Sequence, residues 1–177
     1  MRVPAILLAA LTTAAMLASS GCQLIGNESS GPTCSSQEFS LVKHPALLGD
    51  RKGLVRAFDE AVQQQLQSAT MAEMVQRAGW TMDWDRAIYI GTGTTDARLK
   101  ERAGVDLELA CFTSLPQESS NSDLASPYVT LFLSEGKPVQ AEWWYGQNPR
   151  LDFGEREFLT PDTTFYFDPN PGVMVAQ

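Results

Sequence analysis

The central part of the chain opens with the pattern of an amphipathic helix. From Asp50 onward, apolar residues recur every three or four positions, with charged or amide side chains between them. These apolar residues are Leu54, Val55, Phe58, Ala61, Val62, Leu66 and Ala69. A second helix is predicted over residues 71–78, with Thr70 as its N-cap and Gly79 as the residue that ends it.

Beyond Gly79 the pattern changes to that of β-strands. Runs of aromatic, β-branched and alternating apolar residues predict strands at residues 84–90, 105–113, 128–133, 139–145 and 163–167. The third and fourth strands are separated by a short turn that contains Gly136, which predicts a hairpin. In the second strand the apolar residues share one parity, which places Cys111 on the buried face.

A third helix, Asp96–Ala103, is predicted between the first two strands. Thr94 or Thr95 is expected to cap it and Gly104 to end it. Helices that come first and hairpin-linked strands that follow indicate an α+β fold. We expect an antiparallel sheet of about four to five strands, with the N-terminal helices packed on one face.

The first 21 residues have a different composition. Arg2 is followed by a short apolar run and then by small residues, which is typical of an export signal and too short and weakly apolar for a stable membrane span. Residues 19–22, Ser-Ser-Gly-Cys, resemble the lipobox of bacterial lipoprotein precursors, although Ser19 stands where Leu or Val is usual. The resemblance implies that residues 1–21 are a lipoprotein signal peptide and that Cys22 carries fatty acids such as palmitate. The alternative is an ordinary secretory signal that is cut after residue 20.

A polar segment rich in Gly and Ser follows, so residues 22–38 are predicted to form a flexible tether before a single domain at residues 39–177. Two acyl chains on Cys22 would anchor the protein to a membrane without a spanning helix. By resemblance to enterobacterial lipoproteins, an Asp after the cysteine would retain the protein at the inner membrane, but this chain has Gln23. We therefore expect an exported protein that is anchored to the cell envelope, at the outer membrane and facing the periplasm.

The chain has three cysteines, which is an odd number for an oxidising compartment. Lipidation of Cys22 leaves Cys34 and Cys111 as a pair, and a disulfide between them is the natural prediction. Two unrelated buried thiols are the alternative.

Acidic residues outnumber basic ones by 21 to 13, for a formal net charge of −8. Such a chain repels phosphate, which argues against nucleic-acid binding. Removal of the signal peptide also removes Arg2 and makes the mature chain more acidic. Since His44 is the single histidine, a multi-ligand zinc or haem site is not expected, and neither a metal nor another cofactor is predicted.

Candidate catalytic groups are few. Residues 91–96, Gly-Thr-Gly-Thr-Thr-Asp, lie between a predicted strand and helix, where backbone amides can bind phosphate. This segment lacks the further glycine or lysine of nucleotide-binding loops, and a capped turn accounts for all of it. The carboxylate pairs Asp83 with Asp85 and Glu155 with Glu157 are interpreted as surface charges. We therefore do not predict an enzyme.

Trp143, Trp144 and Tyr145 form the most unusual local feature. Consecutive residues on a strand point to opposite faces, so the three rings cannot all enter one core. At least one ring must face a second layer, a partner or water. A partner contact is one interpretation, and packing under a helix or under residues 151–158 is the alternative.

Several short motifs occur together in the second half of the chain. Trp-Asp-Arg at residues 84–86 leads a strand, a Thr-rich turn leads into Leu-Lys-Glu-Arg-Ala-Gly at 99–104, and Leu-Phe-Leu at 131–133 precedes Gly-Lys-Pro-Val at 136–139. This arrangement, over residues 84–154, resembles a widespread group of small, uncharacterised bacterial lipoproteins. The resemblance supports the fold and the envelope location and implies no known activity.

Together these observations predict a lipid-anchored envelope protein that acts by protein binding, as a scaffold or an assembly factor. The alternative is a periplasmic inhibitor or immunity protein that neutralises a basic hydrolase, with association steered by the acidic charge. An envelope enzyme is the third hypothesis.

Overall fold

The computed structural model describes Cys34 and residues 38–119, 125–145 and 150–177. Within these residues the helices are α1 (Gly53–Gln63), α2 (Met71–Arg77), α3 (Asp96–Ala103) and the short 3-10 helix η1 (Leu109–Cys111). The strands are β1 (Phe39–Ser40), β2 (Ser68–Thr70), β3 (Arg86–Ile90), β4 (Phe112–Thr113), β5 (Tyr128–Ser134), β6 (Lys137–Trp144), β7 (Leu151–Asp152), β8 (Phe158–Leu159), β9 (Thr164–Asp168) and β10 (Val173–Ala176). The predicted signal peptide, Cys22 and most of the predicted tether lie outside the described residues.

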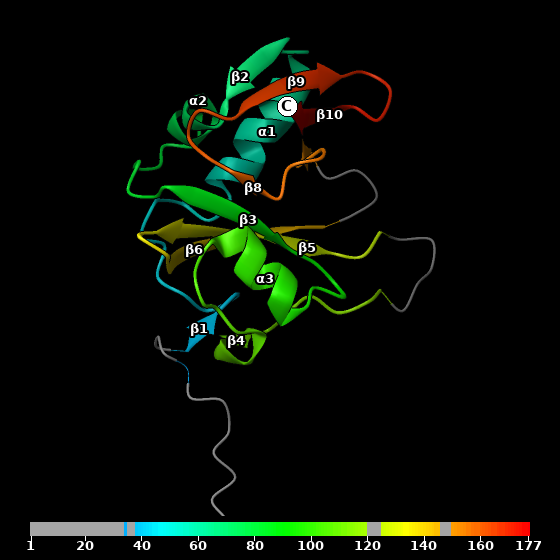
Figure 1. Cartoon of the computed structure of the whole chain (residues 1–177). Helices are drawn as coiled ribbons and strands as arrows, with labels where there is room; N and C mark the ends of the chain where they lie inside the picture. Colours follow the sequence, from blue (N-terminus) through cyan, green and yellow to red (C-terminus); the bar gives the residue numbers. More distant parts are fainter. Residues whose placement is uncertain (1–33, 35–37, 120–124, 146–149) are drawn as a thin grey trace, which may run out of the picture. The chain divides into compact units, whose positions relative to one another are not determined.

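In the described part of the chain, the strands form two four-stranded sheets and one two-stranded sheet (Figure 1). One sheet is antiparallel throughout, in the order β6-β5-β3-β8, and its hairpin pairs Val129 with Trp143. The other has the order β2-β9-β10-β7, with β10 and β7 parallel. Strands β1 and β4 form the small parallel pair. The α+β class is therefore confirmed, whereas the strands divide between two main sheets where a single one was predicted.

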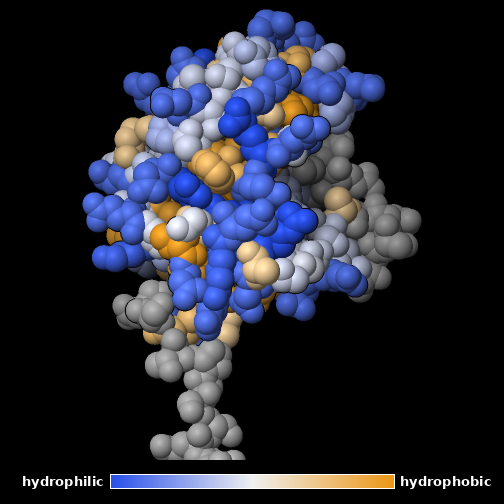
Figure 2. Space-filling view, in the orientation of Figure 1, coloured by the Kyte–Doolittle hydropathy of each residue, from blue (hydrophilic) through white to orange (hydrophobic). Residues whose placement is uncertain are grey.

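The antiparallel sheet has a hydrophobic core on each face, because its strands alternate their side chains between the two faces. Ala87 and Phe132 face the larger core, which also contains residues of α1, α2 and the second sheet. Ile88 and Leu131 face the smaller core, which contains Leu99 of α3. Figure 1 shows α1 between the two four-stranded sheets and α3 beside β3. With its apolar residues inside, the molecule presents a mostly hydrophilic face in Figure 2, with small separate hydrophobic patches.

Helices α2 and α3 begin and end where their capping residues stand. The Thr70 hydroxyl accepts a hydrogen bond from Glu73 N, and the Glu73 carboxylate accepts one from Thr70 N, which completes a capping box. Thr95 caps α3, and Gly104 ends it in the left-handed conformation with φ of 70°. These predictions are confirmed, as is the β5–β6 hairpin.

Helix α1 is shorter than the apolar spacing predicted. It ends at Gln63, and Gln65 adopts a left-handed backbone with φ of 51°, which stops the helical path. Ala69 lies in β2 and pairs with Phe165 of β9. The apolar spacing continues past the helix because Leu66 and Ala69 pack in the same core as the helix face.

The predicted strand at residues 105–113 is wrong for most of its length. A strand forms only at Phe112–Thr113, after η1. Asp96 at the start of α3 accepts a hydrogen bond from Leu109 N at 2.6 Å, which holds this segment against α3. Leu107 and Leu109 pack in the core shared with α3 without forming a strand, whereas Val105 is exposed.

Cys34 and Cys111 form a disulfide, with their Cα atoms 5.4 Å apart. The predicted pairing is confirmed. Cys111 is buried as expected, although it lies in η1 and not on a strand. The bond holds Cys34 next to the β1–β4 pair, since β4 begins directly after Cys111.

Candidate functional site

The three aromatic residues at the end of β6 occupy three different environments. Trp144 is 3% exposed, lies edge-on to the Phe58 ring at 5.7 Å, and donates from Nε1 to the Thr130 hydroxyl at 2.9 Å. Trp143 points to the other face of the sheet and is half-buried. Tyr145 is 68% exposed, and its ring stacks on that of Trp143 with the centroids 5.5 Å apart. Tyr145 therefore presents aromatic surface outside the core, Trp143 packs at the border of the smaller core, and Trp144 is a core residue.

A groove of about 760 Å³ lies between α1 and the edge of β6. Its volume is in the range of sites that hold small molecules. Its apolar lining consists of Leu41, Val42, Val55, Ala141, Trp143 and Tyr145. Polar and charged side chains from α1, from the residues before it and from β6 complete the lining. The stacked aromatic pair is thus part of a concave and largely apolar surface.

One border of the groove is the outer side of β6, which ends the order of the antiparallel sheet among the described residues. At Ala141 the His44 side chain covers this edge. Its Nε2 lies 3.3 Å from Ala141 N and 3.1 Å from Ala141 O. Every second residue of an antiparallel strand directs its backbone groups to the same side, so the N–H and C=O of Trp143 also point away from β5. Such an edge can pair with another chain.

Glu142 also lines the groove, although it is only 4% exposed. The Gln140 amide is its hydrogen-bond donor, at 3.5 Å. Burial raises the pKa of the Glu142 carboxyl to about 8, against the smaller opposing effects of the Gln140 hydrogen bond and the Arg51 charge. The carboxyl is therefore mainly protonated at pH 7.

Arg51 joins the segment after β1 to the start of α1. Its guanidinium group donates hydrogen bonds to the carbonyl oxygens of Val42 and His44. Because Val42 and His44 line the groove, Arg51 holds one wall of it in place.

Two ion pairs lie along α1 beside the groove. Arg56 pairs with Asp50 at 3.7 Å, and Asp59 pairs with Arg150 at 3.2 Å. Their side chains are substantially exposed, so each pair contributes little to stability. Their main effect is to balance the charge along this wall.

The sequence indicated the aromatic members of the groove but not Glu142, His44 or Arg51. Residues 139–143 alternate between apolar and polar, which predicts that Gln140 and Glu142 face water. Both are buried in the structure, because α1 and the segment before it cover that face of β6. The amphipathic pattern of α1 was the only available signal, since such a helix requires an apolar surface to cover.

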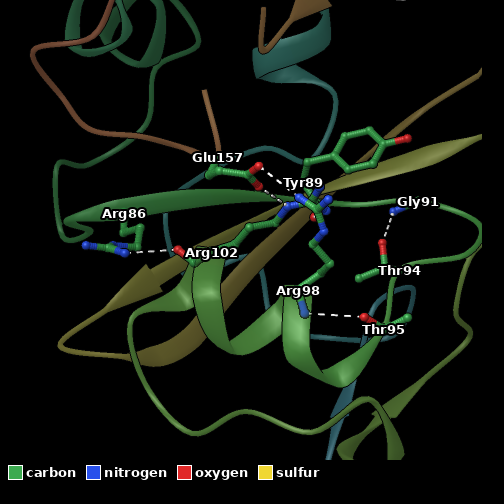
Figure 3. Close-up of polar contacts among 8 residues, drawn as sticks. All are labelled: Arg86, Tyr89, Gly91, Thr94, Thr95, Arg98, Arg102 and Glu157. Carbon is green, nitrogen blue, oxygen red and sulfur yellow. Dashed lines mark hydrogen bonds and ion pairs between the residues drawn. The ribbon is translucent and has the colours of Figure 1, made fainter. Parts of the chain in front are cut away.

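A second group of charged side chains lies where α3 meets the segment before β8 (Figure 3). Glu157 accepts hydrogen bonds from Arg98 at 3.1 Å and from Arg102 at 2.9 Å, and Arg102 also donates to the Tyr89 carbonyl. The hydrogen bond from Arg102 lowers the pKa of Glu157, which keeps this carboxylate ionised. A cavity of about 560 Å³ borders the group. Because the charges pair with one another, the cluster serves to attach α3 to the sheet.

The Gly-Thr-Gly-Thr-Thr-Asp segment forms the turn from β3 into α3 (Figure 3). The Thr94 hydroxyl accepts a hydrogen bond from Gly91 N at 3.0 Å, and the Thr95 hydroxyl accepts one from Arg98 N at 3.3 Å. Both hydroxyl groups therefore act within the turn and the helix cap, in agreement with the structural interpretation of this segment.

The remaining carboxylate candidates lie at the surface. Asp83, Asp85 and Glu155 are exposed, and Asp85 accepts a hydrogen bond from Glu135 N in the hairpin turn at 2.6 Å. Across the described ranges, no three His, Cys, Asp or Glu residues are grouped so that they could hold a metal ion.

No protein-family model matches this chain, and no curated protein or solved structure matches it either. The resemblance to small bacterial lipoproteins stays a prediction. Among the residues that the structure describes, no helix combines the length and the apolar character needed to cross a membrane. Function is therefore inferred from the groove itself.

Proposed function

We propose that this protein acts by binding a partner protein in the cell envelope, as a scaffold or an assembly factor, and that the partner binds in the groove between α1 and β6. The observation that supports this is the stacked Trp143–Tyr145 pair on the apolar side of the groove. Aromatic side chains contribute strongly to binding when a partner covers them, because they bury a large area with little loss of conformational freedom. The 68% exposure of Tyr145 leaves such an area free to be covered.

We further propose that the protein is anchored to the outer membrane through lipid on Cys22. The signal-like N-terminus and the lipobox-like residues 19–22 support this location. The polar tether would place the domain, and with it the groove, at a distance from the membrane surface. A partner could then be an integral or a peripheral protein of the envelope.

A second candidate function is inhibition of a basic hydrolase in the periplasm. The net charge of −8 favours it, because long-range attraction would steer a basic partner toward an acidic protein. Association with such a partner would slow steeply as the salt concentration rises.

Site-specific crosslinking in the producing cells tests the proposed site. The photoreactive residue p-benzoylphenylalanine replaces Tyr145 in one variant and Tyr166, an exposed tyrosine of β9, in the matched control. We expect a discrete crosslinked product from position 145 and none from position 166. Mass spectrometry of the product then separates an envelope assembly protein from a basic hydrolase.

Two results would contradict the proposed function. One is the same set of products from both positions, which would indicate random encounters at the surface. The other is the absence of any product from position 145 while the variant is folded and correctly located.

A further inference from the structure

Glu142 is a buried acid without a cation in contact. Glu142 lines the groove, and in the described part of the chain no basic side chain lies within ion-pair distance of its carboxyl. The nearest donor, the Gln140 amide at 3.5 Å, is neutral and at the limit of hydrogen-bond range. A weakly paired buried polar group costs free energy, and a ligand that supplied a cation would remove that cost.

We propose that the groove receives the basic side chain of an extended partner segment, a lysine or an arginine whose charged end meets Glu142. This inference rests on the proposed function, because it specifies the chemistry of the partner that binds there. The apolar stem of such a side chain would lie along the apolar lining. The stacked rings of Trp143 and Tyr145 line the same groove from the other face of β6 and add to its apolar surface.

The edge of β6 favours an extended segment over a helix. His44 already takes the place of a neighbouring strand at Ala141, through the contacts of its Nε2 with the Ala141 backbone. The backbone groups of Trp143 point to the same side, and the Trp143 indole donates a hydrogen bond to the Leu41 carbonyl at 2.8 Å. A segment added there would gain main-chain hydrogen bonds, and its alternate side chains would enter the groove.

Other charges near Glu142 come mainly from the start of α1 and the residues before it. They are Asp50, Arg51, Lys52, Arg56, Asp59 and Glu60. His44 faces the groove from the segment after β1, and Tyr145 faces it from the end of β6. The three basic residues balance the three acidic ones, and Arg51 and Arg56 are already bound to acceptors of the protein. Asp59 is in turn paired with Arg150, whereas Glu142 forms no ion pair with a basic side chain among the described residues.

Two synthetic peptides test the proposed cation. One is acetyl-Thr-Val-Arg-Val-Thr-amide, and the other has citrulline, which is similar in shape but neutral, in place of arginine. Titrated into the full chain in detergent, the arginine peptide is expected to bind on the order of tenfold more tightly. Glu142→Gln should remove this preference. The matched control Glu101→Gln, which removes an exposed carboxylate of α3, should leave it unchanged.

Proton release on peptide binding is a second measurement, and a purely structural role of Glu142 would not affect it. Because burial raises the pKa of Glu142, a cation beside it favours the ionised form, and binding at pH 7 should release a proton. The affinity for the arginine peptide should therefore rise between about pH 6 and about pH 9, and the affinity for the citrulline peptide should not. Calorimetry in two buffers of different ionisation enthalpy measures this proton, which the Glu142→Gln variant should not release.

Equal affinity for the two peptides, a preference that survives Glu142→Gln, or no saturable binding of the arginine peptide would each overturn this inference. In each case, crosslinking from position 145 would still support the proposed function. If position 145 gives no crosslinked product but the arginine preference persists, the proposed partner protein is contradicted. The inference about Glu142 then still stands.

Discussion

At the scale of single residues, Gln140 and Glu142 show how differently a neutral and an ionisable side chain behave when buried on the same strand. The Gln140 carbonyl accepts a hydrogen bond from Leu48 N at 2.9 Å, and its amide donates to Gly49 O at 3.3 Å. A fully buried amide is thereby paired at both ends. Among the described residues Glu142 has one weak hydrogen-bond donor, and its ionised form is destabilised by burial.

The stability of the protein should therefore depend on the protonation of Glu142. Its pKa is about 8 in the folded state against 4.5 for the free side chain, so the folded state binds more protons and loses stability as pH rises from 4.5 to 8. Since a tenfold change in an equilibrium is worth about 1.4 kcal/mol, the full penalty above pH 8 is on the order of 5 kcal/mol. The Glu142→Gln variant should lack this penalty.

Urea unfolding of the wild type and of Glu142→Gln at pH 4, 6 and 8 measures the effect. We expect the variant to gain stability over the wild type progressively with pH and to show little difference at pH 4. If the two proteins differ in the free energy of unfolding by the same amount at pH 4, 6 and 8, the assigned protonation of Glu142 is contradicted.

At the scale of elements, α2 shows how a helix of seven residues can be stable. So short a helix does not persist alone, because nucleation is costly. The capping box pairs Glu73 N with the Thr70 hydroxyl at 3.2 Å and Thr70 N with the Glu73 carboxylate at 2.7 Å. Met71, Met74 and Val75 then pack in the larger core. Cap and core together hold α2 in place.

The substitution Thr70→Ala removes the hydroxyl from the box. We expect a loss of about 1 kcal/mol in the free energy of unfolding, as is usual for an N-cap threonine. Thr81→Ala is the control, because Thr81 is exposed and bonded through its backbone. Urea unfolding measures both variants, and equal losses would mean that the cap contributes nothing of its own.

At the scale of the whole molecule, the disulfide and the groove are connected through the segment after β1. Cys111 holds Cys34 next to the β1–β4 pair. The chain then continues to Leu41, Val42 and His44, which form one wall of the groove. Loss of the disulfide should therefore loosen that wall as well as destabilise the domain.

Replacement of both cysteines, Cys34→Ser with Cys111→Ser, tests this connection. The disulfide closes a loop over a sequence separation of 77 residues. Loss of a cross-link over a loop of that length should lower the free energy of unfolding by about 4 kcal/mol. Denaturant unfolding without reductant measures the loss, and reduced wild type should behave like the double variant. A loss below about 1 kcal/mol would contradict a structural role for the bond.

The sequence by itself determined the features that depend on residues close to one another in the chain. Thr70, Thr95 and Gly104 mark ends of α2 and α3 because capping hydrogen bonds reach only three or four residues. The hairpin was predictable because Gly136 suits its turn, with φ of 75°. The disulfide followed from the number of cysteines. The sequence also indicated the aromatic residues of the groove, Trp143 and Tyr145. Adjacent residues of a strand face opposite sides, so Trp143, Trp144 and Tyr145 could not all enter one core.

Only the tertiary structure decided which element covers each face. The alternation in residues 105–113 predicts a strand, but Leu107 and Leu109 pack in the core shared with α3 without forming one, and Val105 is exposed. By the same rule Glu142 should face water, yet α1 and the segment before it cover that side of β6 and form the groove. The physical reason is that apolar patterning records the need for burial, whereas the choice of covering element depends on contacts between residues far apart in the chain.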